Sequence, residues 1–312
     1  MPKALAALAG QALPKALAAL AGQAFALPHN APSLMHNTCS QLSQSITMEV
    51  VTYLALGAVA GLISGLFGLG GGIIIVPILI FAFHLQGIDP QISTHMAIAT
   101  SLATIAVTSL SSIYTHHHKS SVRWDLVKRM SPGIVLGSIA GGMFALSLNG
   151  IKLQSLFGIF LVMIAFQMLF HRPVMGSRLL PGTPGLGLAG VGIGALSSLF
   201  GIGGGSLTTP FLSFFGIRIH QAVGTAAACG LTIALSSLLI YATSAEINYQ
   251  LPEATIGYIF LPAWLGIILT STPFARLGAL LAHRLNGELL TKCFGIVALI
   301  IGARFIYNNL MS

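Results

Sequence analysis

The chain has 312 residues, of which 55% are apolar and only 6% are Asp, Glu, Lys or Arg. A soluble domain carries about 25% charged residues and a disordered chain needs low hydrophobicity, so the composition excludes both classes. The formal net charge of +8 arises from 14 Lys and Arg against 6 Asp and Glu. The basic residues are spread along the sequence, without the basic stripe that a nucleic-acid-binding face requires. We therefore predict a polytopic membrane protein, whose partner is the lipid bilayer and not a nucleic acid.

The N-terminal part of the chain contains a short tandem duplication. Residues 2–13, PKALAALAGQAL, recur almost unchanged as residues 14–25, PKALAALAGQAF. Each unit is too short to cross a bilayer, which takes about 20 residues of helix. Lys3 followed by an Ala/Leu run resembles a degenerate signal peptide, although Lys15 interrupts the pattern. We assign residues 1–47 to an N-terminal extension that is either such a signal or disordered.

From Val50 onward, apolar segments alternate with short polar loops. Most of the segments have the length of one helical crossing, about 20 residues. Two are longer than 30 residues, and each of these contains a glycine cluster. The predicted fold is therefore an all-α polytopic membrane protein with about eight hydrophobic segments, namely 50–83, 95–115, 131–149, 153–170, 185–216, 221–243, 254–275 and 289–307.

The two long segments are copies of each other. Residues 61–79, GLISGLFGLGGGIIIVPIL, and residues 194–212, GALSSLFGIGGGSLTTPFL, are identical at ten of nineteen aligned positions. The next segments also match, with Thr100 aligned to Thr225. Because internal duplication is common in transporters, we predict two homologous membrane repeats. The domain boundaries are 1–47 for the N-terminal extension, 48–171 for the first repeat, 172–184 for a cytoplasmic linker and 185–312 for the second repeat.

Basic residues predict the orientation of the repeats, because cytoplasmic loops collect Lys and Arg. The loop after Thr115 in the first half holds Lys119, Arg123, Lys128 and Arg129. Its counterpart in the second half, 244–253, contains two Glu and no Lys or Arg. Equivalent loops therefore lie on opposite sides of the membrane, which predicts inverted repeats with both termini outside.

This orientation requires each glycine-interrupted segment to enter and leave the membrane on the same side. The pieces on either side of the glycines would reach only about 24 and 20 Å at 1.5 Å per residue, short of the roughly 30 Å hydrocarbon core. We therefore predict re-entrant half-helices that meet near the membrane midplane. The alternative is a single kinked helix that projects from the membrane.

The glycine clusters Gly68-Leu-Gly-Gly-Gly72 and Gly201-Ile-Gly-Gly-Gly205 are the strongest candidates for a substrate site. Glycine permits close backbone approach, and a helix that restarts after it presents unpaired N–H groups with a partial positive charge. Such a helix start binds an anion without any Lys or Arg, and broken membrane helices use it near the midplane. The alternative role is close helix packing through small residues.

Hydroxyl side chains form a second group of candidates in the segments that follow the glycine clusters. Thr100, Thr104 and Thr108 recur at a spacing of four, so they share one helix face. Such residues can also serve only to hydrogen-bond helix carbonyls. Together with the glycines, the predicted substrate-binding residues are Gly68, Gly70, Gly71, Gly72, Thr100, Ser101, Gly201, Gly203, Gly204, Gly205, Ser206 and Thr225.

The acidic residues avoid the centres of the predicted segments, where proton-coupled carriers place carboxylates or histidines. We therefore expect a small anionic substrate held by uncharged donors. The cysteines show no metal-binding spacing, and His116-His117-His118 are interpreted as a loop tip, so we predict no cofactor, no metal site and no catalytic residues. The alternatives left open are a membrane-embedded enzyme and an accessory subunit without transport. The sequence also leaves the oligomeric state open, a homodimer included.

The paired Leu-Phe-Gly-x-Gly-Gly-Gly motifs, each followed by a proline at 77 or 210, resemble the sulfite exporter TauE/SafE family. The stretch Val122-Arg-Trp-Asp125 is similar to the same family, and the resemblance covers about residues 50–308. It implies a multi-pass inner-membrane permease for small oxyanions such as sulfite, organosulfonates or small carboxylates. The second half departs from the pattern where Ala226-Ala-Ala-Cys229 replaces the Ser-Leu that follows Thr100.

Overall fold

The computed structural model describes residues 51–63, 72–118, 120–170, 180–244, 251–252, 254–282 and 287–310. The chain divides into two compact units, Met1–Val51 and Thr52–Ser312, and all described residues except Val51 belong to the second unit. The N-terminal extension, the glycines Gly68, Gly70 and Gly71, and most of the linker therefore lie outside the described residues.

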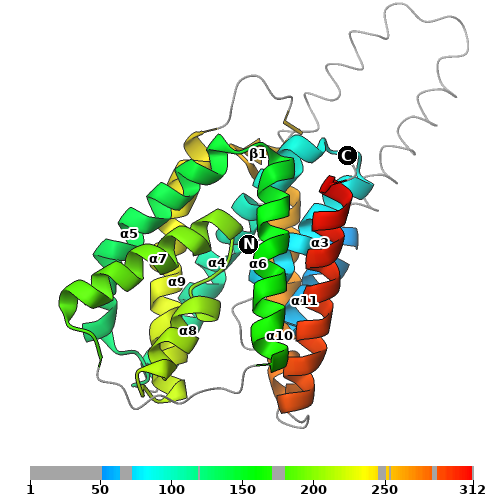
Figure 1. Ribbon diagram of the computed structural model, residues 1–312. Coiled ribbons are helices and arrows are strands. Elements are labelled where there is room, and N and C mark those ends of the chain that lie inside the picture. The colour runs from blue at the N-terminus through cyan, green and yellow to red at the C-terminus, as the bar shows by residue number, and fades with distance from the viewer. Residues whose placement is uncertain are drawn as a thin grey trace, which may run out of the picture. The chain divides into compact units, whose positions relative to one another are not determined.

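The described part of the chain is built of helices and one short hairpin (Figure 1). Five helices, α4 to α7 and α9, are long and apolar enough to cross a membrane, in agreement with the predicted all-α membrane protein. Helices Val51–Ile63, α3 and α8 are shorter, whereas α10 and α11 have 22 and 24 residues. The helices are Val51–Ile63, α3 (Gly72–Leu85), α4 (Pro90–His118), α5 (Trp124–Ser147), α6 (Gly150–Phe170), α7 (Thr183–Phe200), α8 (Gly205–Phe214), α9 (Ile219–Thr243), α10 (Leu261–Ala282) and α11 (Gly287–Leu310).

The apolar segment expected at 254–275 begins as a β-hairpin and not as a helix. Strands β1 (Thr255–Ile256) and β2 (Ile259–Phe260) pair antiparallel around a two-residue turn. Gly257 in this turn has φ of +58°, which glycine adopts without strain. A Cβ on Gly257 would lie 2.5 Å from the carbonyl oxygen of Tyr241. The hairpin tip therefore packs against the end of α9. Hydropathy along the sequence does not predict this tertiary contact.

The second glycine cluster interrupts its segment between α7 and α8. Helix α7 ends at Phe200, Gly201 takes the left-handed conformation with φ of 65°, and α8 begins at Gly205. With 10 residues, α8 has the length of a half-helix, about 15 Å. With 18 residues, α7 is about 27 Å long and is longer than the sequence pattern predicted.

Glycines allow α5 and α7 to pack side by side at very close range. A Cβ on Gly133 would collide with the carbonyl oxygen of Gly187, and one on Gly141 with that of Ala195. Because contacts advance in the same direction along both helices, α5 and α7 are parallel. This small-residue interface is the kind that lets membrane helices associate through backbone contact.

Helices α4 and α9 pack antiparallel in the middle of the unit (Figure 1). Gly224 near the start of α9 lies against His116 near the end of α4. Farther along, Ala234 of α9 belongs to the same buried cluster as Ile105 and Ala106 of α4. This antiparallel pair supports the glycine junction described next.

Candidate functional site

The start of α3 packs directly against the second glycine motif. Gly72 is buried, and a Cβ added to it would lie 2.7 Å from the carbonyl oxygen of Gly201 and 3.0 Å from the nitrogen of Gly203. Real Cβ atoms do not approach backbone this closely, so only glycine fits at position 72. The structure therefore brings the end of the first glycine cluster into contact with the second, although the two are far apart in the sequence.

Helix α4 holds the turn at Gly201 in place. The hydroxyl of Ser101 donates a hydrogen bond to the carbonyl oxygen of Gly201 at 2.8 Å, and Ser101 is fully buried. The turn is closed from the other side by the N–H of Ile202, which donates to the carbonyl of Ser197 at 2.9 Å. A Cβ on Gly201 would lie 2.9 Å from the Cα of Ile98. Ser101 thus anchors the glycine turn to α4.

Helix α8 starts at this junction with no side-chain cap. Its N-cap, Gly204, lies so close to α9 that a Cβ would be 2.7 Å from the nitrogen of Gly230. The hydroxyl of Ser206 donates to the carbonyl of Gly203 at 3.1 Å, so it does not cap the helix start. The first N–H groups of α8 therefore keep the partial positive charge of an uncapped helix N-terminus.

Buried hydroxyls without a hydrogen-bond partner flank the break on both sides. Ser197, in the last turn of α7, and Thr208, in the first turns of α8, are both 0% exposed, and neither side-chain oxygen has a partner. An unsatisfied buried polar group costs about 1–3 kcal/mol, so such groups call for a ligand or water. Neither residue is among the substrate-binding residues predicted from the sequence. The identity of Ser64 and Ser197 between the repeats was the pattern that could have pointed to Ser197.

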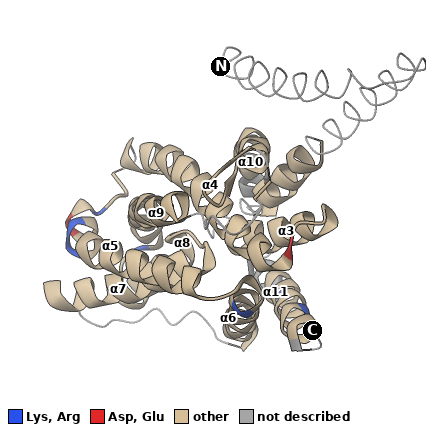
Figure 2. Ribbon diagram, turned by 90° about the horizontal axis from the view of Figure 1, so that it is seen from above, with Lys and Arg blue, Asp and Glu red and all other residues tan. Residues whose placement is uncertain are grey.

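No charged residue belongs to the helices that surround the junction. Helices α3, α4, α7, α8 and α9 contain no Asp, Glu, Lys or Arg, and Figure 2 shows described Lys and Arg mainly on or beside α5, α6 and α11. Arg123, beside the start of α5, is paired with Asp125 at 2.7 Å, in a position exposed to solvent. An ion at the junction would therefore meet backbone N–H and hydroxyl donors without a counter-charge.

The structure does not bring Thr100 and Thr225 together. Thr225 lies beside Gly224, which packs on His116 of α4. His116 is sixteen residues from Thr100 along α4, or about 24 Å at 1.5 Å per residue. Thr100 accepts a hydrogen bond from the backbone N–H of Phe260 at 3.1 Å, and Thr225 accepts one from Arg123 at 3.0 Å. Each hydroxyl therefore holds the start of another helix, and a single small ion cannot contact both.

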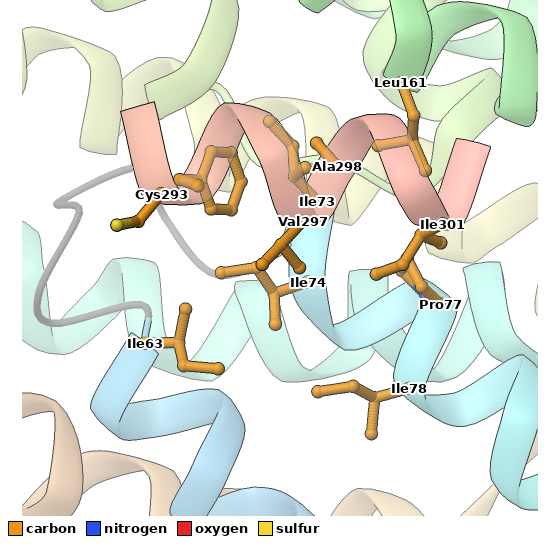
Figure 3. Close-up of a pocket in the computed structure, with 11 residues that line it drawn as sticks. Ile63, Ile73, Ile74, Pro77, Ile78, Leu161, Cys293, Val297, Ala298 and Ile301 are labelled. Carbon is orange, nitrogen blue, oxygen red and sulfur yellow. The ribbon is translucent and has the colours of Figure 1, made fainter. Parts of the chain in front are cut away.

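A cavity of about 380 Å³ lies next to the start of α3, and none of the hydroxyl donors described above lines it (Figure 3). Its walls come from the helix that ends at Ile63 and from α3, α6 and α11. All lining side chains are apolar except the thiol of Cys293, which points toward its edge. The residues seen in Figure 3 include Ile63, Ile73, Ile74, Pro77, Ile78, Leu161, Cys293, Val297, Ala298 and Ile301. This cavity has no donor for an oxyanion, so it is not the predicted site.

Comparison with known proteins places the chain among membrane transporters. The sequence profile described as Sulfite exporter TauE/SafE matches residues 53–305. The chain is 34% identical over 255 residues to a "Probable membrane transporter protein" of Haemophilus influenzae, which covers 81% of this chain and 96% of that protein. It is 27% identical over 286 residues to the "Probable membrane transporter protein YunE" of Bacillus subtilis, over 85% of this chain and 100% of that protein. No solved structure matches the chain.

Proposed function

Because the chain belongs to the sulfite exporter TauE/SafE family, we propose that it is a permease that moves small oxyanions across the inner membrane. Membership in the family and the five helices long enough to cross a membrane support a multi-pass membrane transporter, and the relatives are named "Probable membrane transporter protein". The proposed substrates are of the sulfite, organosulfonate or small carboxylate type. The observation that carries this proposal is the uncapped start of α8 beside the contact of Gly72 with Gly201 and between two unpartnered hydroxyls.

The donors at the junction suit an oxyanion. The first-turn N–H groups of α8 and the hydroxyls of Ser197 and Thr208 can each donate a hydrogen bond, and bonds to a charged acceptor contribute about 1.5–3 kcal/mol each. An oxyanion offers several acceptor oxygens, whereas a cation offers none. Because the donors are neutral, they do not lock the ion in place as a buried Lys or Arg would. Binding can then be reversible, as transport requires.

The junction is closed in this structure, because Gly72 is in van der Waals contact with the Gly201 turn. We infer that the ion enters when α3 separates from this turn. In transporters with inverted repeats, one repeat moves against the other around a fixed site near the membrane midplane. The contact between α3 of the first half and the glycine turn of the second half lies at the boundary where that motion would occur.

Several packing contacts support the proposal of two repeats. Gly133-Ile-Val-Leu-Gly-Ser138 of α5 matches Gly266-Ile-Ile-Leu-Thr-Ser271 of α10, and Phe157-Gly-Ile159 of α6 matches Phe294-Gly-Ile296 of α11. A Cβ on Gly158 would lie 3.1 Å from side-chain atoms of Phe305 and Ile306 in α11. Reciprocally, one on Gly295 would lie 3.1–3.4 Å from Leu169 and Met168 in α6. Such reciprocal contacts are expected of elements related by a twofold axis.

The path of the second glycine segment supports the proposed orientation. Helix α7 runs parallel to α5, so it starts at the end of the unit where α5 starts. The start of α9 lies at that same end, because Gly224 packs on the carbonyl of Ser121 in the α4–α5 loop. The pair α7 and α8 therefore leaves and returns to the end that carries the basic α4–α5 loop (Figure 1). By the positive-inside rule we propose that this end is cytoplasmic and that both termini are outside.

The test is anion uptake by proteoliposomes, with labelled sulfite, sulfoacetate and acetate as the panel. The double variant Ser197→Ala/Thr208→Val removes one unpartnered hydroxyl on each side of the break and should raise KM about tenfold or more, since each lost hydrogen bond to an ion is worth about 1.5–3 kcal/mol. Ser213→Ala is the matched control, because its buried hydroxyl is also unpartnered but lies in the last turn of α8. Equal KM values in the double variant and the control would remove the junction as the site. A wild-type protein that passes none of the three anions would contradict the proposed substrate class and favour an accessory role.

A further inference from the structure

The two repeats place a histidine at the same position, five residues before the threonine that caps another helix. His95-Met-Ala-Ile-Ala-Thr100 begins the pattern in α4, and His220-Gln-Ala-Val-Gly-Thr225 repeats it in α9. We propose that His95 and His220 are a symmetry-related pair of gate residues, and that this structure is closed at the His95 end and open at the His220 end. This inference rests on the proposed inverted repeats.

His95 joins three elements at its end of the unit. Its side chain is only 5% exposed, and its Nε2 lies 3.1 Å from the carbonyl oxygen of Ala145 in the last turns of α5. Its ring packs on the ring of Tyr258 in the hairpin, with 5.5 Å between ring centroids. A histidine near a span end is ordinarily free to reach solvent, so its burial requires that α4, α5 and the hairpin stay together.

Neighbouring contacts seal the same end. The hydroxyl of Tyr241 donates to the carbonyl of Ser198 at 3.2 Å, which links α9 to α7 beside the glycine break. The N–H of Phe260 donates to Thr100, which ties the hairpin to α4, but the equivalent bond from Arg123 to Thr225 is also made, so this bond is common to both ends. The first turn of α4 touches the first residue of α6, where a Cβ on Gly150 would collide with the carbonyl of Gln91. Several helices and the hairpin therefore cover the junction from the His95 side.

His220 lies in the opposite situation. It is the second residue of α9 and is exposed, and its ring has no hydrogen bond to any of the residues that the structure describes. Its expected partners follow from the repeat. The equivalent of Ala145 on α10 is Gly278, twelve residues after Gly266 as Ala145 is twelve after Gly133. The equivalent of Tyr258 is Ser121. Tyr258 lies two residues before Phe260, whose N–H donates to Thr100, and Ser121 lies two residues before Arg123, whose N–H donates to Thr225.

An inverted-repeat carrier reaches its second state when the two halves exchange conformations. In that second state His95 loses the carbonyl of Ala145 and becomes exposed, while His220 meets the carbonyl of Gly278 and becomes buried. Each histidine thus stabilises only the state in which its own end is closed. A change at one histidine must then alter the exposure of the other, which lies at the far end of the molecule.

The test is carbethoxylation of the histidines by diethyl pyrocarbonate, followed site by site by mass spectrometry on the wild-type protein. His118, which is exposed, is the internal reference. Because a minor state is populated at roughly 0.1–10%, His95 should react about tenfold or more slowly than His220. Addition of sulfoacetate should shift the two rates in opposite directions. Rates that are equal, or that change together, would overturn the proposal.

A second arm needs no substrate, so it separates this inference from the proposed function. His95→Ala should slow the labelling of His220 several-fold, because the state closed at the His95 end loses a stabilising contact. His220→Ala should not speed the labelling of His95. A purely structural role for His95 would leave His220 unchanged, and that result would contradict the gate. If His95→Ala does not purify as a monodisperse protein, His95→Gln replaces it. Coupled labelling without any anion flux would remove the proposed substrates and leave the gate standing.

Discussion

Thr100 accepts a hydrogen bond from the backbone N–H of Phe260 at 3.1 Å, across 160 residues of sequence. The bond is buried, and it holds the residue that precedes α10 against the middle of α4. Thr225 does the same for Arg123 at the start of α5. A hydroxyl that looked like a substrate ligand is thus already engaged in joining the halves.

Thr100→Val should destabilise the protein by about 1–3 kcal/mol, because the buried N–H of Phe260 loses its acceptor while the side-chain shape is kept. Thr225→Val should cost less, because its partner N–H belongs to Arg123, which is only half-buried. Thermal unfolding in detergent compares the two variants with the wild type. If Thr100→Val keeps the wild-type Tm and instead raises KM, Thr100 binds substrate.

Removal of the unpartnered hydroxyl of Thr208 should not lower the free energy of unfolding, in contrast to the change at Thr100. Thr208→Val deletes a buried oxygen that has no partner, so the variant should be as stable as the wild type or more stable by about 1 kcal/mol. Binding residues often lower stability for the sake of function. The same unfolding assay gives the answer, and a Tm lower than that of the wild type would show that Thr208 has a structural partner.

Gly72→Ala should abolish or strongly reduce transport. The added methyl would lie 2.7 Å from the carbonyl of Gly201, so α3 could no longer close on the glycine turn. Gly192→Ala on α7 is the matched control, because a Cβ at that position meets nothing within 4 Å. Uptake by proteoliposomes should be lost in the first variant and kept in the second. Equal uptake by both would mean that closure of this contact is not part of the transport cycle.

The proposed orientation predicts opposite labelling of two exposed loop positions. In a background without the native cysteines, Ser120→Cys in the α4–α5 loop should react with an impermeant maleimide only from the cytoplasmic side. Lys152→Cys, at the start of α6, should react only from the outside. Both positions are exposed, so burial does not limit the reaction. Labelling of Ser120→Cys in intact cells would reverse the topology.

The glycine motif was predictable as a site where the backbone breaks, whereas its contacts were not. Gly201 ends α7 in the left-handed conformation, as a glycine cluster inside an apolar segment indicates. That Gly72 touches this turn, and that Thr225 of α9 lies beside the end of α4 and far from Thr100, depends on how segments fold against each other. Hydropathy also could not separate the hairpin at 255–260 from a helix, because its position depends on the backbone of Tyr241.

The sequence by itself determined the class of this protein, its duplicated glycine motifs and its family. These properties follow from the composition and from short stretches of sequence, because a chain with so few charged residues is expected in a membrane. The tertiary structure alone decided which hydroxyls are already engaged, which stay unpartnered beside the glycine turn, and which of two equivalent histidines is buried. The reason is physical: a hydrogen bond or a burial depends on distances between residues that the sequence sets far apart.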